Sequence, residues 1–461
     1  MRKLLANLGF VLQSSGLMVL LAVFVGFYYN EIQATTGLLL TSVVFFCTGF
    51  VLNALCERKE LDFKTSCTLV AVVFFLLGLI GSIPYMYLNV FPSESKNESF
   101  LNSFFESVSG FTTTGFSFIS NIDSQPKSLI FYRSLTQWIG GIGIVFIILA
   151  FFYPENILDN LSKPLNFEKA GSTLKRTYFG VLTIYTVYAV IFVFIFHVLG
   201  FDLITSASLT FSSISTGGFS PTVNAEKIFS YPTNIVVMVL MLIGATSFAI
   251  HYKIFSGKFK GAPYIELLVF ILIIIFGILL VGCFTNLDFL TSAFHIVSAS
   301  TTTGHSFIEI KSLNSSVKLL MIFLMFIGGS YFSTAGGIKV MRFISFLKSI
   351  PWTIKNLITG KLEDFSCSWR KFSHPEIFAY LAFILIAVLL ISIATFIFVL
   401  HGFSLEDSLF DVTSAFATTG LTTNVTSILL APHLKIILIL LMILGRIEIL
   451  PLLVALFPKS K

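Results

Sequence analysis

Four short segments rich in Thr, Ser and Gly contain the residue types that could bind a dehydrated cation. They read S-G-F-T-T-T-G-F at 109–116, S-S-I-S-T-G-G-F at 212–219, S-A-S-T-T-T-G-H at 298–305 and S-A-F-A-T-T-G-L at 414–421. Backbone carbonyl groups and Thr hydroxyl groups supply oxygen ligands, and Gly permits the positive φ that turns such a loop. Because rings of these oxygens can replace the water around a monovalent cation, the segments predict an ion-selective filter.

The candidate filter residues are the four that end at the glycine of each segment. They are Thr112, Thr113, Thr114, Gly115, Ser215, Thr216, Gly217, Gly218, Thr301, Thr302, Thr303, Gly304, Ala417, Thr418, Thr419 and Gly420. The cation ligands are expected at Thr113, Thr114, Thr216, Gly217, Thr302, Thr303, Thr418 and Thr419. A single T-T-G after a helix usually marks a glycine-capped helix end. Four occurrences at matching positions favour the filter.

Composition places these segments in a membrane protein. Of the 461 residues, 56% are hydrophobic and only 11% are charged, whereas about a quarter of the residues of a soluble domain are charged. This excludes a cytosolic enzyme, a secreted disulfide scaffold and a disordered chain. The net charge of +6 does not indicate nucleic-acid binding, because most basic residues are expected in loops on the cytoplasmic side of the membrane.

Ten apolar stretches predict helices that span the lipid bilayer, since about 20 helical residues cross its hydrocarbon layer. They are residues 4–30, 32–56, 65–93, 134–154, 177–201, 228–252, 267–287, 319–344, 377–405 and 433–457. With both termini in the cytoplasm, this count places most basic loops inside. The four Thr-rich segments must then enter and leave on the outer face. Such backbone is tolerated at membrane depth only when it is buried in protein or lines a water-filled cavity.

Each Thr-rich segment follows a short apolar stretch and lies between two expected spans. The sequence therefore predicts an all-α membrane protein with four units of span, half-helix, loop and span around one pore. The expected divisions are two extra N-terminal helices at 1–64 and repeats at 65–162, 163–262, 263–372 and 373–461. The half-helices would direct their partly negative C-terminal ends toward the axis. Acidic residues, Glu106 and Asp411 among them, outnumber basic residues in the expected outer regions, which favours cations at the mouth, although any one of these acids could instead cap a half-helix.

The four T-x-G loops in one chain resemble the Trk/Ktr/HKT superfamily of potassium transporters. Three further stretches carry the resemblance: R-S-L-T-Q-W-I-G-G-I-G-I at 133–144, F-I-G-G-S-Y-F-S-T-A-G-G-I-K-V-M-R at 326–342 and L-G-R-I-E-I-L at 444–450. They are similar to the inner helices of the first, third and fourth repeats in that superfamily. Two extra spans before the first repeat are typical of its TrkH branch, and the likeness covers the whole chain.

The resemblance implies K+ uptake across a bacterial inner membrane, with K+ and Rb+ preferred over Na+, by a homodimer with one pore per protomer. Glycine at all four filter positions goes with K+ in this superfamily, whereas Ser at the first goes with Na+. The resemblance also implies a separate cytoplasmic TrkA-like ring that binds NAD or an adenine nucleotide, and no cofactor is expected in this chain. Gly140, Gly141 and Gly143 lie inside an expected span, so they do not indicate a dinucleotide site.

A second group of small residues, four of them glycines, interrupts the expected inner helix of the third repeat. It comprises Gly328, Gly329, Ser333, Thr334, Gly336 and Gly337. Because glycine disfavours regular helix, a local break below the filter is expected, and the resemblance assigns it the role of an intramembrane gate. Tyr331 and Phe332 stand where members of the superfamily usually have small residues.

Arg446 is expected in the gate as well, because an arginine in the bilayer costs at least about 2.5 kcal/mol unless it faces a polar interior. We expect it to project below the filter, to bond to the 328–337 loop and to repel cations until that loop moves. The alternative is a structural arginine that binds neighbouring carbonyl groups. Lys339 is expected to extend to the cytoplasmic surface, and His305 is interpreted as a packed or solvated side chain rather than a pH-sensitive group.

Two other classes of function compete with this interpretation. A secondary transporter, coupled to or conducting Na+, usually has inverted repeats, whereas these four run in one orientation. A membrane enzyme would need a cluster of acids, histidines or a nucleophile, and the candidates are too scattered. The sequence therefore predicts a transporter and not an enzyme.

Overall fold

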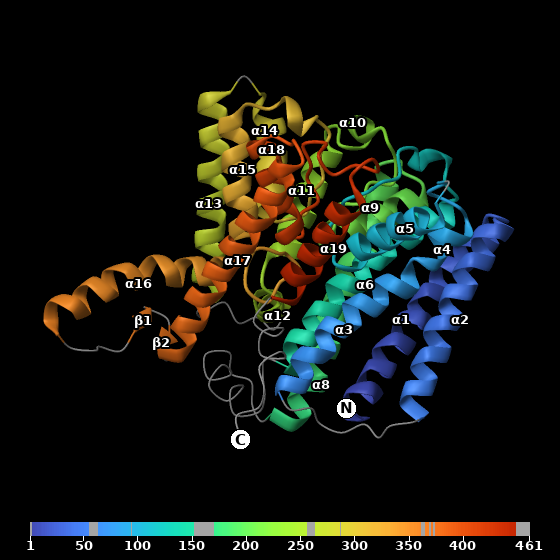
Figure 1. Ribbon diagram of the computed structural model, residues 1–461, viewed down its shortest axis with the longest axis horizontal. Coiled ribbons are helices and arrows are strands. Elements are labelled where there is room, and N and C mark those ends of the chain that lie inside the picture. The colour runs from blue at the N-terminus through green and yellow to red at the C-terminus, as the bar shows by residue number, and fades with distance from the viewer. Residues whose placement is uncertain are drawn as a thin grey trace.

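The computed structural model describes residues 2–54, 63–93, 95–151, 170–255, 263–285, 287–360, 365–367, 370–371 and 374–448. Helices make up almost all of this structure (Figure 1). They are α1 (Arg2–Tyr28), α2 (Ile32–Ala54), α3 (Phe63–Gly81), α4 (Ile83–Tyr87), α5 (Lys96–Phe111), α6 (Lys127–Phe151), α8 (Ala170–Val198), α9 (Leu203–Ile214), α10 (Ala225–Ile228), α11 (Thr233–Ala245), α12 (Phe248–Phe255), α13 (Pro263–Phe284), α14 (Phe289–Ser300), α15 (Ser315–Ile327), α16 (Val340–Thr359), α17 (His374–Leu400), α18 (Leu405–Phe416) and α19 (Pro432–Ile447). Two short strands, β1 (Ser366–Cys367) and β2 (Arg370–Lys371), pair antiparallel.

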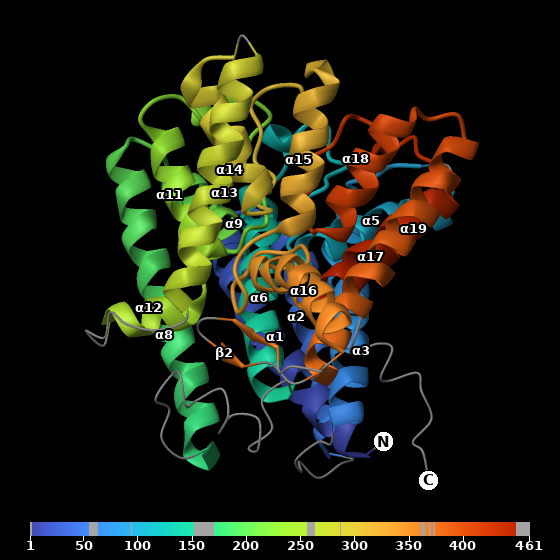
Figure 2. The same ribbon diagram turned by 90° about the vertical axis from the view of Figure 1, so that its left-hand side faces the viewer.

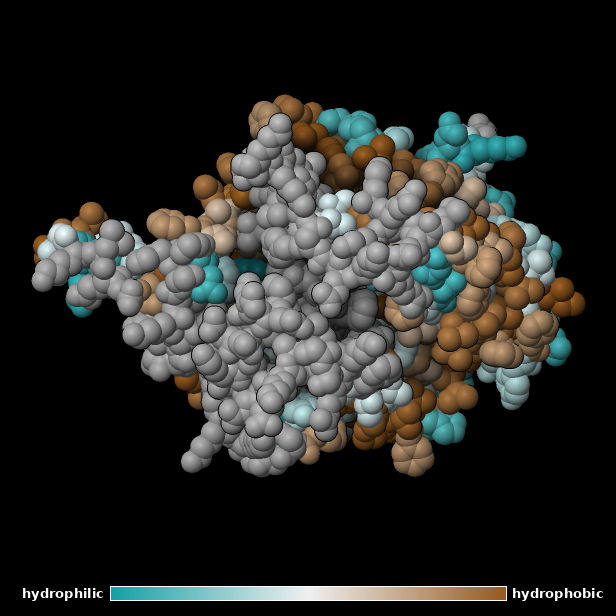
Figure 3. Space-filling view, turned by 90° about the horizontal axis from the view of Figure 1, so that it is seen from below, coloured by the Kyte–Doolittle hydropathy of each residue, from teal (hydrophilic) through white to brown (hydrophobic). Residues whose placement is uncertain are grey.

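Six stretches of helix in the described residues are long and apolar enough to cross a membrane. They are residues 4–28, 32–54, 68–87, 180–198, 264–283 and 376–400. Many large apolar side chains on them are exposed, including Val190, Phe276 and Leu400. Seen from below in Figure 3, much of the described surface at the rim of the molecule is hydrophobic. The protein is therefore a multi-pass membrane protein.

One expected span, residues 228–252, is not a continuous helix. Its two parts, α11 and α12, are bent by 100° at Thr246 and Ser247, so the helix expected over this stretch is broken. The loop between α15 and α16 bonds to the groups that the bend frees: Ser330 N donates to Ala245 O at 3.0 Å, and Phe248 N donates to Phe332 O at 2.9 Å. A break whose backbone groups find such partners is stable inside a protein.

The other three expected spans differ in their continuity. The first and the last contain α6 and α19, which are helical over 127–151 and 432–447. The second of the three, residues 319–344, is divided into α15 and α16, with residues 328–339 between them. The end of the expected span 433–457 and the expected divisions at 162, 262 and 372 lie outside the described residues.

Each half-helix packs between two longer elements. The half-helix α5 contacts α3 and α6, α9 contacts α8 and α11, α14 contacts α13 and α15, and α18 contacts α17 and α19 (Figure 2). The longer element that follows each half-helix, namely α6, α11, α15 or α19, is called its inner helix below. Each inner helix also contacts the half-helix of the next unit. These contacts are α6 with α9, α11 with α14, α15 with α18, and α19 with α5. Because the last contact returns to the first unit, the four units close into a ring.

The first two helices form a hairpin beside the first unit. A Cβ atom added at Gly9 would lie 2.6 Å from Gly49 O, and one added at Gly49 would lie 2.6 Å from Gly9 O. Small residues allow this close approach of two helices in a membrane. Glu31, between the two helices, accepts hydrogen bonds from Lys127 N at 2.7 Å and Ser128 N at 2.9 Å. A carboxylate at a helix N-terminus satisfies its free N–H groups, so Glu31 joins the hairpin to α6.

Candidate functional site

The four Thr-rich segments adopt one backbone conformation. Their half-helices end with C-caps at Thr112, Ser215, Thr301 and Ala417. The next residue of each is a threonine with φ between 49° and 54°, and the fourth is a glycine with φ between 77° and 91°. A positive φ is rare for a β-branched residue. We call residues 112–115, 215–218, 301–304 and 417–420 the TxG loops.

A serine in each half-helix holds the TxG loop that follows it. The residue before each glycine donates its N–H to the carbonyl of this serine: Thr114 to Ser109 at 2.9 Å, Gly217 to Ser212 at 2.7 Å, Thr303 to Ser298 at 2.9 Å and Thr419 to Ser414 at 2.8 Å. The Ser109 hydroxyl also donates to Phe116 O at 2.7 Å, and the Ser298 hydroxyl donates to His305 O at 2.7 Å. The bonds to the serine carbonyls satisfy helix-end groups that would otherwise be free, and the two hydroxyl bonds hold the residue after the loop glycine.

The four glycines bring the TxG loops together in one ring. A Cβ atom added at a glycine would collide with the carbonyl oxygen before the glycine of the next loop: Gly115 with Gly217 O at 2.2 Å, Gly218 with Thr303 O at 2.1 Å, Gly304 with Thr419 O at 1.8 Å and Gly420 with Thr114 O at 2.1 Å. Each loop therefore contacts the next, and the fourth contacts the first. All sixteen residues predicted from the sequence belong to these four loops.

Two acids predicted for the outer mouth lie instead inside the protein. Glu106 and Asp411 are buried, and each is the ninth residue before its loop glycine. Glu106 accepts a hydrogen bond from Phe118 N at 2.9 Å, and Asp411 accepts one from Thr423 N at 2.8 Å. Both N–H groups belong to the third residue after the glycine. A buried carboxylate needs such donors, and the equal spacing in the two repeats was the sequence signal for these anchors.

The loop between α15 and α16, residues 328–339, lies directly against the TxG loops; we call it the glycine-rich loop. Gly336 N donates to Thr302 Oγ1 at 2.7 Å, and Thr334 Oγ1 lies 3.3 Å from Thr216 Oγ1. A Cβ atom added at Gly336 would lie 1.9 Å from Ala417 O. The glycine-rich loop therefore contacts the TxG loops of the second, third and fourth repeats.

Arg446 joins the glycine-rich loop to the first repeat. Its Nη1 donates to Thr334 O at 2.6 Å and its Nη2 to Gly140 O at 3.1 Å. The side chain is buried. Glu448 forms an ion pair with Arg342 and bonds through the same carboxylate to that guanidinium. Arg446 therefore bonds to the glycine-rich loop, as expected for a gate residue, and also to a carbonyl group of the inner helix α6, as expected for a structural arginine.

Lys339 does not reach the cytoplasmic surface, and that expectation is wrong. The residue has φ of 77°, is 4% exposed, and donates from Nζ to Ala335 O. The carbonyl groups of the glycine-rich loop lack helical partners, and the Ala335 carbonyl accepts from the Lys339 ammonium group instead. The bulky Phe332 packs against Phe248 of α12.

His305 is a packed side chain, as interpreted from the sequence. It is buried, and its Nε2 lies 3.0 Å from Ser213 Oγ of the second half-helix. Its ring centroid lies 5.1 Å from that of Phe229. The residue therefore joins the second and third repeats.

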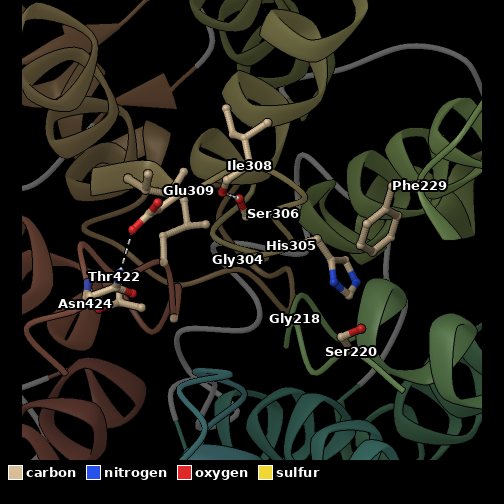
Figure 4. Close-up of a pocket in the computed structure, with 13 residues that line it drawn as sticks. Gly218, Ser220, Phe229, Gly304, His305, Ser306, Ile308, Glu309, Thr422 and Asn424 are labelled. Carbon is tan, nitrogen blue, oxygen red and sulfur yellow. Dashed lines mark hydrogen bonds between the residues drawn. The ribbon is translucent and has the colours of Figure 1, made fainter. Parts of the chain in front are cut away.

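A cavity of about 220 Å³ lies over the ring of loops (Figure 4). Its lining includes the glycines Gly218, Gly304 and Gly420. Glu309 and Asn424 also line it, and Asn424 Nδ2 donates to Glu309 Oε1 at 3.0 Å. Among the described residues, no group of three or more His, Cys, Asp and Glu side chains could hold a metal ion. The cavity adjoins the second, third and fourth TxG loops, whose backbone and hydroxyl oxygens are of the kind that hard cations prefer as ligands.

Comparisons with known proteins agree with this arrangement. The chain matches the TrkH family, described as a cation transport protein, over residues 36–291 and 263–460. The uncharacterized cation transporter MJ1485 of Methanocaldococcus jannaschii is 30% identical over 462 residues, which cover 97% of this chain and 93% of that protein. The Trk system potassium uptake protein TrkH of Escherichia coli (strain K12) is 28% identical over 330 residues, which cover 66% of this chain and 65% of that protein.

The fold also matches a solved structure. The crystal structure of the potassium transporter TrkH from Vibrio parahaemolyticus aligns with a TM-score of 0.85 and 24% identity, and the alignment covers 99% of each chain. This likeness shows that the two chains share their fold. Because the family match extends over most of the sequence, the chain belongs to the TrkH family of cation transport proteins.

Proposed function

We propose that this protein takes up K+ through a selectivity filter formed by the four TxG loops, with K+ and Rb+ preferred over Na+. The observation that carries the proposal is the closed ring, in which each loop glycine lies against a carbonyl oxygen of the next loop. A rigid ring of this kind fixes the spacing of its oxygens, which is a basis for selection by ion size and ligand field. The potassium uptake protein TrkH of Escherichia coli, 28% identical over two thirds of this chain, supports K+ as the transported ion.

Free hydroxyl groups in the loops support the same proposal. The Oγ1 atoms of Thr113, Thr418 and Thr419 are buried, and none has a hydrogen-bond partner within the described part of the chain. Buried polar atoms almost always have partners, so these oxygens are available to a cation. The ligands are proposed at Thr113, Thr114, Thr216, Gly217, Thr302, Thr303, Thr418 and Thr419.

The proposed gate is the glycine-rich loop together with Arg446. The loop lies against three TxG loops, and Arg446 holds its Thr334 carbonyl, so a cation leaving the ring meets both. Opening would need the loop to withdraw and Arg446 to lose this bond. Phe332 and Lys339 have φ of 61° and 77°, and non-glycine residues at such angles cost about 1–3 kcal/mol each. The strain favours a loop that can change conformation.

Assembly and location belong to the proposal as well. The protein would act as a homodimer in a bacterial inner membrane, with both termini in the cytoplasm and regulation by a TrkA-like nucleotide-binding ring. The helix α16 projects from the helix bundle (Figure 1), and its Ile354, Leu357 and Ile358 are exposed. An unpaired apolar face of this kind supports contact with a second protomer or with lipid.

The test measures K+, Rb+, Na+ and Li+ flux into proteoliposomes for the wild type and for Gly115→Ser. The serine Cβ would collide with Gly217 O, so we expect K+ and Rb+ preference in the wild type and weaker preference in the variant. Gly402→Ser is the matched control, because Gly402 has φ of 90° with no atom within 4 Å of an added Cβ, against 91° at Gly115. Equal flux of all four ions in the wild type would reject the proposal and favour a Na+-conducting or Na+-coupled transporter.

A further inference from the structure

The second TxG loop lacks two side chains that the other repeats have: an anchor nine residues before the loop glycine, and a threonine directly before that glycine. Nine residues before the loop glycine, the other repeats have Glu106, His295 and Asp411, whereas the second has Leu209. His295 serves as an anchor as the two carboxylates do, because its Nε2 accepts from Phe307 N at 3.4 Å. The matching residue of the second repeat is Pro221, which has no N–H to donate.

The same loop also lacks a threonine. Before the glycine, the other repeats have Thr114, Thr303 and Thr419, whereas the second has Gly217. In the first and third repeats this threonine bonds through its hydroxyl to the residue two positions earlier: Thr112 Oγ1 lies 2.8 Å from Thr114 Oγ1, and Thr301 Oγ1 lies 2.8 Å from Thr303 Oγ1. The second loop must therefore be held in another way.

The amide of Gln137 occupies the place of the missing threonine side chain. A Cβ atom added at Gly217 would lie 2.5 Å from Cδ, 2.7 Å from Oε1 and 2.8 Å from Nε2 of Gln137. Gln137 Nε2 donates to Gly217 O, and Phe219 N donates to Gln137 Oε1 at 3.2 Å. One fully buried side chain thus binds the residues on both sides of Gly218.

Gln137 comes from α6, the inner helix of the first repeat, and its position is matched in two other inner helices. A Cβ added at Gly140, Gly244 or Gly445 would collide with the last carbonyl of the preceding half-helix, at 2.0, 2.3 and 1.8 Å, so these glycines occupy one register. Three residues before them stand Gln137, Met241 and Met442. Of these three positions, the first alone offers an amide to a TxG loop.

Arg133, one turn before Gln137, supports the same loop. Its Nη1 donates to Ser220 O at 3.4 Å, and its guanidinium lies 4.1 Å from the centroid of the Phe219 ring. Its Nη2 forms an ion pair with Oε1 of Glu106 at 2.8 Å. The anchor of the first loop and the support of the second are therefore connected through α6.

We propose that Gln137 is the positioning residue of the second TxG loop, and that its amide sets the K+ over Na+ selectivity of the ring by fixing the Gly217 carbonyl and the Phe219 N–H. The inference rests on the proposed function, since it gives a cause for the same selectivity. It also explains why the second loop keeps the common conformation, with φ of 52° at Thr216 and 77° at Gly218, although Leu209 of its half-helix supplies no side-chain anchor.

The first test compares Gln137→Leu with Met442→Leu in proteoliposomes. Leucine fills a similar volume but neither donates nor accepts, so the ratio of K+ to Na+ flux should fall several-fold in Gln137→Leu. Met442→Leu, at the matching register, should keep the wild-type ratio. Gln137→Glu retains an acceptor for Phe219 N and loses the donor to Gly217 O, so its ratio should lie between these two.

The second test is a reciprocal rescue, in which the threonine side chain of the other repeats takes the place of the Gln137 amide. Gly217→Thr alone should lower the ratio, because the new side chain collides with the Gln137 amide. Gln137→Ala with Gly217→Thr should restore it, since the alanine leaves room and the threonine hydroxyl can bond to Ser215 as in the first and third loops. This double variant decides the question if Gln137→Leu does not fold.

The outcomes separate the inference from the proposed function. A wild type without K+ preference would overturn both. A selective wild type, with an unchanged ratio in folded Gln137→Leu, would overturn the role of Gln137 alone. A double variant no more selective than Gly217→Thr would overturn it as well.

Discussion

Threonine at the second position of each TxG loop has φ between 49° and 54°, which the chain must maintain at a cost of about 1–3 kcal/mol per residue. The serine carbonyl bonds and the glycine contacts described above hold it there. The sequence predicts the glycines, because only they fit a close approach at positive φ, but it does not predict the strained threonines. Their conformation depends on contacts with the neighbouring loop, which lies far away in the chain.

At this scale we predict the effect of removing Arg446. Arg446→Ala should raise K+ flux in the absence of any partner protein, because Thr334 O loses its 2.6 Å bond and the positive charge below the ring disappears. Arg446→Lys keeps the charge but cannot reach two carbonyl groups with a planar fork, so its flux should be intermediate. Flux in reconstituted vesicles measures both.

Size-exclusion elution and thermal melting control for folding of the two Arg446 variants. An unchanged or lower flux in well-folded Arg446→Ala would mean that Arg446 is structural and does not close the pore.

Among the elements, two interrupted helices fit each other. The bend between α11 and α12 receives the glycine-rich loop between α15 and α16 through the bonds of Ser330 N and Phe248 N. The four glycines at 328, 329, 336 and 337 predict the second break. The first is not predicted, because Thr246 and Ser247 are small and the flanking residues are apolar enough for a continuous span. A bend of this kind depends on a partner loop that the local sequence does not contain.

The buried ion pair of Arg342 and Glu448 fixes the start of α16. At the scale of the elements, we predict the effect of removing this ion pair. Removing one partner of a buried ion pair typically costs about 3–5 kcal/mol. Glu448→Gln should therefore lower the melting temperature clearly and raise flux, because α16, which directly follows the glycine-rich loop, loses its ion pair with the residue that caps α19. Differential scanning fluorimetry and vesicle flux measure the two effects.

Glu406→Gln is the control for this pair. Glu406 lies 3.3 Å from Lys318 and is 31% exposed, and pairs near the surface contribute only about 0–1 kcal/mol. Arg342→Gln combined with Glu448→Gln should recover much of the stability, since no unpaired charge remains. Equal melting temperatures for Glu448→Gln and the wild type would contradict the prediction.

Over the whole molecule, the ring is closed by bonds between neighbouring repeats as well as by the TxG loops. Lys127 of α6 lies 3.8 Å from Asp202, and Lys318 of α15 contacts Glu406 and Asp407 of α18 at 3.3 Å. Lys435 of α19 lies 3.9 Å from Glu98 of α5. Each basic residue belongs to an inner helix, and each acid belongs to the start of the next half-helix.

The fourfold pattern in the sequence predicts such a ring. It does not predict which residues of neighbouring repeats meet, and Gln137 stands 80 positions before Gly217 without any local sign of the contact. Only the packing of α6 against α9 reveals it.

Closure predicts equivalent roles for the four glycines. Gly218→Ser, Gly304→Ser and Gly420→Ser should each weaken K+ preference in the same direction as Gly115→Ser, because each Cβ would meet a carbonyl of the next loop. The effect should be largest at Gly304, where that distance is 1.8 Å. Flux ratios for the three variants, with Gly402→Ser as reference, measure this, and a variant that keeps full preference would exclude its loop from the filter.

Since all four loops belong to one polypeptide, a mutation changes one quarter of the ring and leaves the rest intact. In a ring of four identical subunits, every substitution appears four times. The presence of glycine at position 217, where the other repeats have threonine, would then have to be compatible with all four quarters of the ring together. Here the loss of an anchor at Leu209 and its replacement by Gln137 could arise at one quarter alone. Covalent linkage thus lets the symmetry of the ring be broken one residue at a time, and each quarter can be examined by a single codon change.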